Sequence, residues 1–248
     1  MGKVVAVVSG KGGVGKSTIS AGLGRAISEC GKRVLLVDCD AGLRCLDKLT
    51  GIAEKLVYDI SDAVFGRCAV SEAIYEAEGY EGLYVLPAAA ESFMGENLIT
   101  KEQLTPFINS LKNFYDYIIL DSPAGIGTGF LCAVDPADSF LVVCNSDPVS
   151  AASANKVKSI LEKMGKKDIR LIINRFNQEY FKKLKAINDL DGVIDAAAIR
   201  LLGLVPEDPA LISEFLKGGK VNNKSQTMLS FRRIASRLQG VTVPFTFI

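Results

Sequence analysis

The chain has 248 residues, of which 48% are hydrophobic, and a formal net charge of +1 from 29 basic and 28 acidic side chains. This length fits one large α/β domain, and the balanced charge argues against a protein that binds nucleic acid mainly by electrostatic attraction. The sequence contains no histidine, which excludes imidazole catalysis and histidine-ligated metal sites.

Three further features concern the cellular compartment. The polar pair Gly2-Lys3 leads directly into the apolar run Val4–Val8, which is not the pattern of a secretory signal. No apolar run approaches the roughly 18 residues that a membrane span needs. The six cysteines are scattered without a C-x-x-C pair, which favours free, mostly buried thiols in a reducing compartment. The sequence therefore predicts a cytoplasmic protein.

Short apolar runs alternate with helical patterns along the whole chain. The predicted strands are Val4–Val8, Val34–Val37, Leu83–Leu86, Tyr117–Leu120, Phe140–Val143, Ile169–Ile173 and Leu202–Val205. The predicted helices are Ser17–Cys30, Leu98–Leu111, Ser150–Met164, Pro209–Leu216 and Ser225–Leu238. Strands this rich in Val, Ile and Leu are typical of sheets covered on both faces. The alternation predicts an α/β fold, with a doubly wound and mostly parallel sheet, in a single domain over residues 1–248.

A glycine-rich segment between the first predicted strand and the first predicted helix fits the phosphate-binding loop pattern G-x-x-x-x-G-K-[S/T]. Its members are Gly10, Lys11, Gly12, Gly13, Val14, Gly15, Lys16, Ser17 and Thr18. The glycines allow backbone N–H groups to surround phosphate oxygens, and the following helix directs its positive end at them. We expect Lys16 to contact the β- and γ-phosphates and Ser17 to offer its hydroxyl to Mg²⁺. The segment predicts ATP and Mg²⁺ as cofactors.

The second lysine of this loop, Lys11, is not needed in an ordinary phosphate-binding loop. Its place directly after Gly10 makes it difficult for the side chain to fold back onto its own nucleotide. We therefore expect Lys11 to reach a phosphate held by a second subunit, as an arginine finger does in other proteins. This lysine predicts a homodimer in the ATP-bound state, with Lys11 and Lys16 both catalytic.

Carboxylates follow two of the predicted strands. Asp38 and Asp40 come at the end of one strand and Asp121 at the end of another, before the flexible loop 122–127. A single aspartate in such a place is often only a turn or helix cap. Because the carboxyl ends of parallel strands meet at the ligand-binding edge of the sheet, we expect these three near the phosphate loop. We predict functional roles for all three, with metal contacts, together with Ser17, for Asp38 and Asp121.

Six blocks of sequence, in order along the chain, resemble the MinD/ParA family of deviant Walker A ATPases, and most closely its MinD branch. They are K-G-G-V-G-K-S-T at 11–18, D-C-D-A-G-L-R-C-L-D at 38–47, D-S-P-A-G-I at 121–126, N-R at 174–175, V-P-E-D at 205–208 and P-F-T-F-I at 244–248. The resemblance implies that Asp40 positions the attacking water and that Lys11 acts across the dimer. It also implies that Asn174, Pro206 and Asp208 line the adenine pocket, although Asn174 could instead end a strand and 206–208 could be a plain turn.

The same resemblance implies a Mg·ATP-dependent dimerising ATPase that acts as a spatial and temporal switch in placing the division site or flagella. Two alternatives are a DNA-partitioning ATPase and a metal-centre maturation ATPase. The basic runs at 163–167 and 182–185 are expected to be solvated helix faces, so no specific nucleic acid is predicted. Cys132 has no second cysteine at the spacing of a shared metal cluster.

The resemblance also bears on partners. Related proteins carry a charged helix face where this chain has the small, uncharged segment 150–155, so we expect a regulatory protein partner that the sequence does not identify. Family members usually continue past the P-F-x-F-I block into a basic amphipathic helix that docks on anionic lipid. The printed sequence stops at Ile248, so we expect a peripheral position on the inner face of the cell membrane only if such a tail follows.

Overall fold

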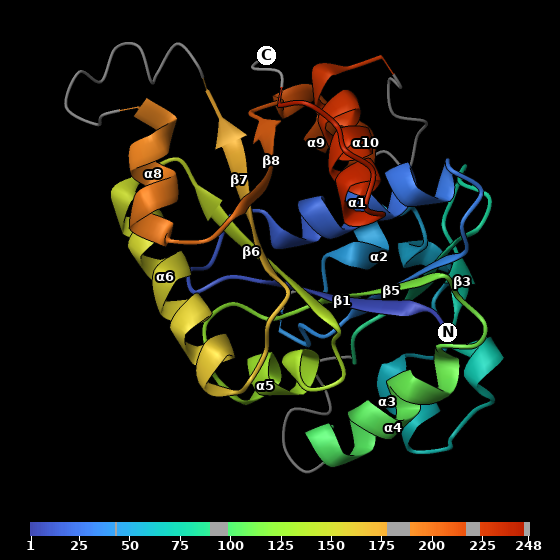
Figure 1. The fold of residues 1–248 in the computed structure, drawn as a ribbon. Helices are drawn as coiled ribbons and strands as arrows, with labels where there is room; N and C mark the ends of the chain where they lie inside the picture. The colour runs from blue at the N-terminus through green and yellow to red at the C-terminus, as the bar shows by residue number, and fades with distance from the viewer. Residues whose placement is uncertain (43, 90–98, 178–188, 217–223, 246–248) are drawn as a thin grey trace.

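The computed structural model describes residues 1–42, 44–89, 99–177, 189–216 and 224–245 (Figure 1). Their centre is one sheet with the strand order β3-β4-β2-β5-β1-β6-β7-β8. The strands are β1 (Lys3–Val8), β2 (Val34–Asp38), β3 (Tyr75–Glu76), β4 (Leu83–Leu86), β5 (Tyr117–Asp121), β6 (Ser139–Asn145), β7 (Ile169–Phe176) and β8 (Leu201–Pro206). All neighbours pair in parallel except β3 with β4. The predicted doubly wound, mostly parallel α/β fold is confirmed.

Helices alternate with these strands. They are α1 (Lys16–Ser28), α2 (Leu46–Leu49), α3 (Ile60–Val64), α4 (Lys101–Leu111), α5 (Thr128–Val134), α6 (Pro148–Lys163), α8 (Asp189–Ala197), α9 (Pro209–Leu216) and α10 (Gln226–Leu238), with 3₁₀ turns at Ala53–Lys55 and Val70–Glu72. The predicted Pro209–Leu216 has the observed bounds. Leu98, where another helix is expected to begin, lies outside the described residues. Ile99 and Thr100 are not helical, and α4 begins at Lys101, where the Thr100 N–H donates to Gln103 Oε1 at 3.0 Å.

Side chains of each strand alternate between two apolar layers. On β1, Val5 and Val7 face a layer formed with α1, α2, α9 and α10, whereas Val4, Ala6 and Val8 face a layer formed with α3, α4, α5, α6 and α8. Figure 1 shows these two sets of helices on opposite faces of the sheet. Burial on both faces explains why the strands are nearly continuous apolar runs.

The strand order reverses direction at the central strand β1. It pairs with β5 on one side and β6 on the other, and β2 lies beyond β5. Ligands of open α/β sheets bind at the carboxyl ends of strands beside such a switch point. The register sets Val7 and Asp38 each opposite Asp121. The ends of β1, β2 and β5 therefore meet where the loop 10–18 begins.

The six cysteines form no disulfide. Only Cys132 and Cys144 are buried, whereas Cys30 is exposed and the other three are half-buried, which corrects the expectation of mostly buried thiols. Among the described residues, no helix has both the length and the apolar composition that crossing a bilayer requires.

Candidate nucleotide site

The glycine-rich loop joins β1 to α1 in the geometry of an anion cradle. Gly13 and Gly15 adopt left-handed backbone angles, with φ of 74° and 91°. Helix α1 begins at Lys16 with no side-chain cap and with no acidic residue in its first turn. The N–H groups at an uncapped helix N-terminus need an acceptor, and the helix dipole favours a negative one. The residues present therefore fit a bound phosphate group.

Asn174 fixes the shape of this loop from β7. Its Nδ2 donates a hydrogen bond to the carbonyl of Val14 at 2.8 Å, and its side chain is buried. A Cβ at Gly15 would lie 2.3 Å from the same Nδ2 atom. Glycine is therefore required at position 15 both by its φ angle and by the approach of Asn174. An adenine contact for Asn174 stays a prediction.

Lys16 lies within the site and is 8% exposed. Its Nζ donates to Ser9 Oγ at 3.1 Å, and Ser9 Oγ donates in turn to the carbonyl of Lys11 at 2.8 Å. Burial lowers the pKa of the Lys16 ammonium group, while the nearby carboxylates of Asp121 and Asp40 act in the opposite direction. The side chain is thus a desolvated positive charge at the head of α1.

Asp121 joins β5 to the first turns of α1. The carboxyl is buried and accepts a hydrogen bond from Ser20 Oγ at 3.1 Å and another from the Ser17 hydroxyl. Burial raises the pKa of Asp121 to about 6, against the opposing effects of Ser17 and then of the Lys16 charge. Hydroxyl and carboxylate oxygens together are ligands that suit Mg²⁺, directly or through water. The Ser17–Asp121 pair therefore fits a magnesium ion beside the phosphates.

Asp38 organises the loop that follows β2. One of its carboxylate oxygens accepts the N–H of Asp40 at 2.9 Å, and the other accepts the N–H of Leu46 at 3.2 Å. This pattern is the capping arrangement that single aspartates often adopt. Burial, and then the charge of Asp121, raise the pKa of Asp38 to about 8. The metal contact expected of Asp38 stays a prediction, and the observed bonds favour its role in shaping the loop.

The pKa of Asp38 predicts how stability depends on pH. The folded pKa lies above the ordinary value of 3.8, so between about pH 4 and pH 8 the folded protein holds a proton that the unfolded chain releases. The free energy of unfolding therefore falls as pH rises through this window. In Asp38→Asn, we expect the melting temperature of the nucleotide-free protein to fall less between about pH 5 and pH 8 than in the parent. Asp191→Asn, an exposed change on α8, is the control, and equal pH slopes for Asp38→Asn and the parent would contradict the assignment.

Asp40 and Lys11, two of the predicted catalytic residues, lie at the rim of the nucleotide site. Asp40 is half-buried, accepts the N–H of Gly42 at 3.2 Å, and is close enough to influence the pKa of Lys16. The Lys11 side chain is exposed and makes no hydrogen bond or ion pair within the part of the chain that the structure describes. The loop after β5 is tied to the same rim, because the Gly125 N–H donates to the carbonyl of Ser9 at 3.2 Å.

The residues expected at the adenine lie further along the same edge. Pro206 ends β8, and Asp208 accepts the N–H of Leu211 at 3.1 Å and the hydroxyl of Thr227 at 2.9 Å. Asp208 thus caps α9 and joins it to α10, which is the structural role of a turn residue. Contact of either residue with adenine stays a prediction.

Sequence reasoning missed Ser9 and Ser20. Ser20 follows Ser17 by three positions on α1, and this spacing sets both side chains on the face toward Asp121. The one sequence signal at Ser9 is that the apolar run of the first strand ends immediately before it. Of the basic runs, Lys166 donates to the carbonyl of Asp135 and Lys163 is exposed, while Lys182, Lys183 and Lys185 lie outside the described residues.

A phosphate-binding loop at the switch point of a parallel sheet defines a P-loop nucleotide-binding protein. Residues 5–221 match the family model of the CobQ/CobB/MinD/ParA nucleotide binding domain, and the chain belongs to this family. The septum site-determining protein MinD of Synechocystis sp. is 36% identical over 99% of this chain and 92% of its own length.

Solved structures agree with this assignment. The chain is similar to one in the MinC:MinD cell division protein complex of Aquifex aeolicus, with a TM-score of 0.90, 35% identity and coverage of 99% of both chains. It is also similar to the septum site-determining protein MinD of Pyrococcus horikoshii complexed with Mg-ADP, with a TM-score of 0.85, 28% identity and coverage of 96% of both. The predicted family and the predicted class of enzyme, an ATPase of the MinD type, are confirmed.

Proposed function

We propose that this protein is a Mg·ATP-dependent switch that takes part in placing the division site. The observation that carries the proposal is the convergence of Lys16, Ser17 and Asp121 at the head of α1, where the lysine and the aspartate are buried. The names of the MinD relatives, which are septum site-determining proteins, support the cellular role. The described strands, which lie between residues 3 and 206, all belong to one sheet, and this supports a single domain.

Each residue of the site has a distinct part in phosphoryl transfer. The loop amides and the Lys16 ammonium bind the phosphates and stabilise the charge that develops on them. Mg²⁺, when bound, neutralises phosphate charge, and Ser17 and Asp121 would hold it. The Asp40 carboxylate orients the attacking water and accepts its proton. Asn174 keeps the loop in shape, and Pro206 and Asp208 border the adenine.

The ATP-bound form is a homodimer in this proposal. An exposed lysine is suited to contact a phosphate of a second copy, and Lys11 is exposed with no side-chain partner among the described residues. Hydrolysis then removes the group that Lys11 holds, and the dimer separates. A regulatory protein partner reads the ATP-bound form, as the MinC:MinD complex from Aquifex aeolicus suggests for that protein. The switch works in the cytoplasm, and contact with the inner face of the cell membrane would require an amphipathic helix of the kind that family members carry after this core.

The role of Asp40 is tested by Asp40→Ala. We expect Mg·ATP to bind with unchanged affinity, because the carboxylate acts on the transition state more than on the bound ground state. Single-turnover hydrolysis should slow by about 10²–10⁴-fold, which is the usual contribution of a general base. Quench-flow measurement of bound ADP gives the rate. Glu54→Ala, an exposed change elsewhere on the surface, is the control, and an unaltered rate in Asp40→Ala would remove Asp40 from the mechanism.

Two other functions can be distinguished from this one. A DNA-partitioning ATPase would give an electrophoretic shift that weakens steeply with salt, whereas the net charge of +1 favours no such binding. A metal-centre maturation ATPase would carry metal after purification. The described residues contain no group of three or more His, Cys, Asp or Glu side chains suited to a metal ion.

A further inference from the structure

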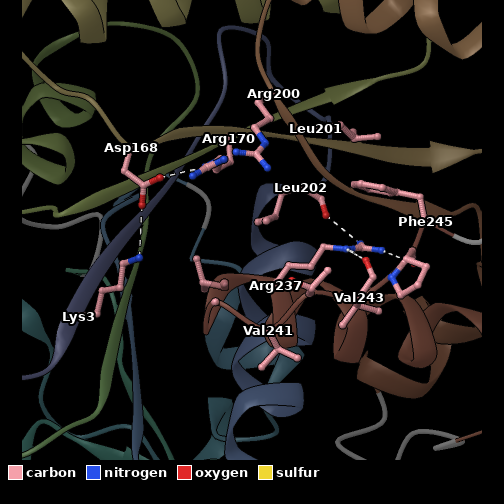
Figure 2. A pocket seen from close by; sticks show the side chains of 14 residues that line it. Lys3, Asp168, Arg170, Arg200, Leu201, Leu202, Arg237, Val241, Val243 and Phe245 are labelled. Atoms are coloured by element: carbon pink, nitrogen blue, oxygen red, sulfur yellow. Dashed lines mark hydrogen bonds and ion pairs between the residues drawn. The ribbon is translucent and has the colours of Figure 1, made fainter.

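A cavity lies at the edge of the sheet opposite the nucleotide site. It has a volume of about 630 Å³ and opens at the amino ends of β1, β7 and β8, beneath the segment 240–245. The nucleotide loop follows the carboxyl end of β1, so the two sites are separated by the length of that strand. Figure 2 shows the side chains that line the cavity.

The cavity has a marked excess of positive charge. Lys3, Arg170, Arg200 and Arg237 line it, and the carboxylate among its lining residues is Asp168. Asp168 is already engaged, since it accepts from Lys3 Nζ at 3.3 Å, Arg170 Nε at 3.0 Å and Ser139 Oγ at 2.6 Å. Four cations against one carboxylate leave the cavity three charges positive.

Arg237 accounts for one of these cations as a structural residue. Its guanidinium donates to the carbonyls of Leu202, Val243 and Pro244 at 2.9–3.0 Å and stacks on the Phe245 ring at 4.0 Å. These contacts fasten the segment 241–245 as one wall of the cavity. Figure 2 shows the bonds to Leu202 and Val243 as dashed lines.

Arg170 and Arg200 form a like-charge pair on the opposite wall. Leu171 pairs with Leu201 in the parallel ladder of β7 and β8, and the Leu171 N–H donates to the carbonyl of Arg200 at 2.9 Å, so Arg170 and Arg200 directly precede the paired residues. Both side chains line the same cavity, and like charges placed in this way repel each other. Arg200 is exposed and makes no side-chain hydrogen bond or ion pair in the described residues, and Arg170 contributes only its Nε to Asp168. An anion bound between the two guanidinium groups would remove this repulsion.

The positive charge continues into an adjoining hollow. This second cavity, of about 410 Å³, shares Arg200 with the first and is also lined by Lys166, Lys167 and the ion pair of Lys158 with Glu162 at 3.6 Å. Lys166 donates to the carbonyl of Asp135, whereas Lys167 is exposed. Arg200 therefore lies between two cavities, and each of them has more basic than acidic lining residues.

We propose that Arg170, Arg200 and Lys3 bind the phosphate group of a small soluble molecule at this edge of the sheet. The planar guanidinium donates paired hydrogen bonds that match phosphate oxygens, which an ammonium group does not. A phosphate monoester carries close to two negative charges at neutral pH, which suits a cavity with three excess positive charges. This site is separate from the nucleotide site and is not required for hydrolysis.

The test uses the full chain with Mg·ADP in the nucleotide site, so that the phosphate loop is occupied. Isothermal titration with glycerol 3-phosphate should show saturable one-to-one binding. In Arg200→Gln we expect the affinity to fall by about tenfold or more, because a charged hydrogen-bond donor is lost. Arg200→Lys should lose part of the affinity, since it keeps the charge without the paired donors. ATP hydrolysis should be unchanged in both variants.

Lys163→Ala removes one positive charge at the end of α6 outside both cavities, and it should leave the affinity unchanged. Equal binding by the parent and Arg200→Gln, or no saturable binding by the parent, would overturn the proposal.

Co-sedimentation with phosphatidylglycerol vesicles distinguishes the source of the phosphate. Vesicle binding that depends on Arg200, without binding of glycerol 3-phosphate, would overturn the assignment to a soluble molecule and place a lipid headgroup there. Binding of duplex DNA alone would overturn it as well.

Discussion

Lys16→Ala is expected to abolish ATP hydrolysis, with a loss on the order of 10³-fold or more in the turnover rate at saturating Mg·ATP. The Lys16 ammonium group lies at the head of α1 with its Nζ on Ser9, where it is the central positive charge available to the phosphates. Alanine leaves the developing phosphate charge without this partner. Phosphate release by the purified variant is the measurement.

A stability measurement separates this effect from misfolding. Burial lowers the pKa of Lys16, which means that the folded protein disfavours its charged form, so alanine should not lower the melting temperature of the nucleotide-free protein. Lys55→Ala, an exposed change, is the control for loss of a positive charge. Normal turnover by Lys16→Ala would refute the assignment of the loop.

Lys11→Ala is expected to spare nucleotide affinity and to remove dimerisation together with most hydrolysis. The Lys11 side chain is exposed and has no partner within the described part of its own chain, so its loss should change the affinity of the monomer by about twofold at most. A positive charge supplied across an interface to the transferred phosphate contributes about 10³–10⁵ to the rate. We expect hydrolysis to fall within that range.

Two measurements check this prediction. Nucleotide binding is followed with a fluorescent ATP analogue, and association is followed by light scattering with Mg·ATP. Lys55→Ala again serves as the control. If Lys11→Ala dimerises as well as the parent does, the proposed action of Lys11 across the interface is wrong.

Local pattern was sufficient to predict most of the sheet. The strands β1, β2 and β5 are buried on both faces, so their apolar runs are unbroken and easily recognised. The predicted strands end at Val37 and Leu120, one residue before the observed ends at Asp38 and Asp121, because a charged residue is seldom found inside a buried strand. Both carboxyls stay in the ladder because hydrogen bonds satisfy them. The strand β3 was missed because it has only two residues.

Short helices were missed for a related reason. The helices α2, α3 and α5 have four, five and seven residues, which is too few for a helical period to emerge from the sequence. Their positions depend on contacts made elsewhere in the fold. The start of α2, for example, is held by the bond from the Leu46 N–H to Asp38, eight positions earlier.

The nucleotide site was predictable where one continuous motif defines it. The loop 10–18 carries its glycines, Lys16 and Ser17 within nine residues, so their proximity follows from the sequence. The bond from Asn174 to Val14 joins residues 160 positions apart, and no local pattern indicates it. Arg170 and Arg200, which line one cavity, are likewise brought together by the pairing of β7 with β8.

The molar mass of the protein in solution tests the ATP-dependent switch most directly. Multi-angle light scattering is recorded with Mg·ATP, using Asp40→Ala to prevent turnover, and with Mg·ADP. We expect twice the chain mass of 26.6 kDa with Mg·ATP and a single chain mass with Mg·ADP. A mass that is the same with both nucleotides would contradict the switch.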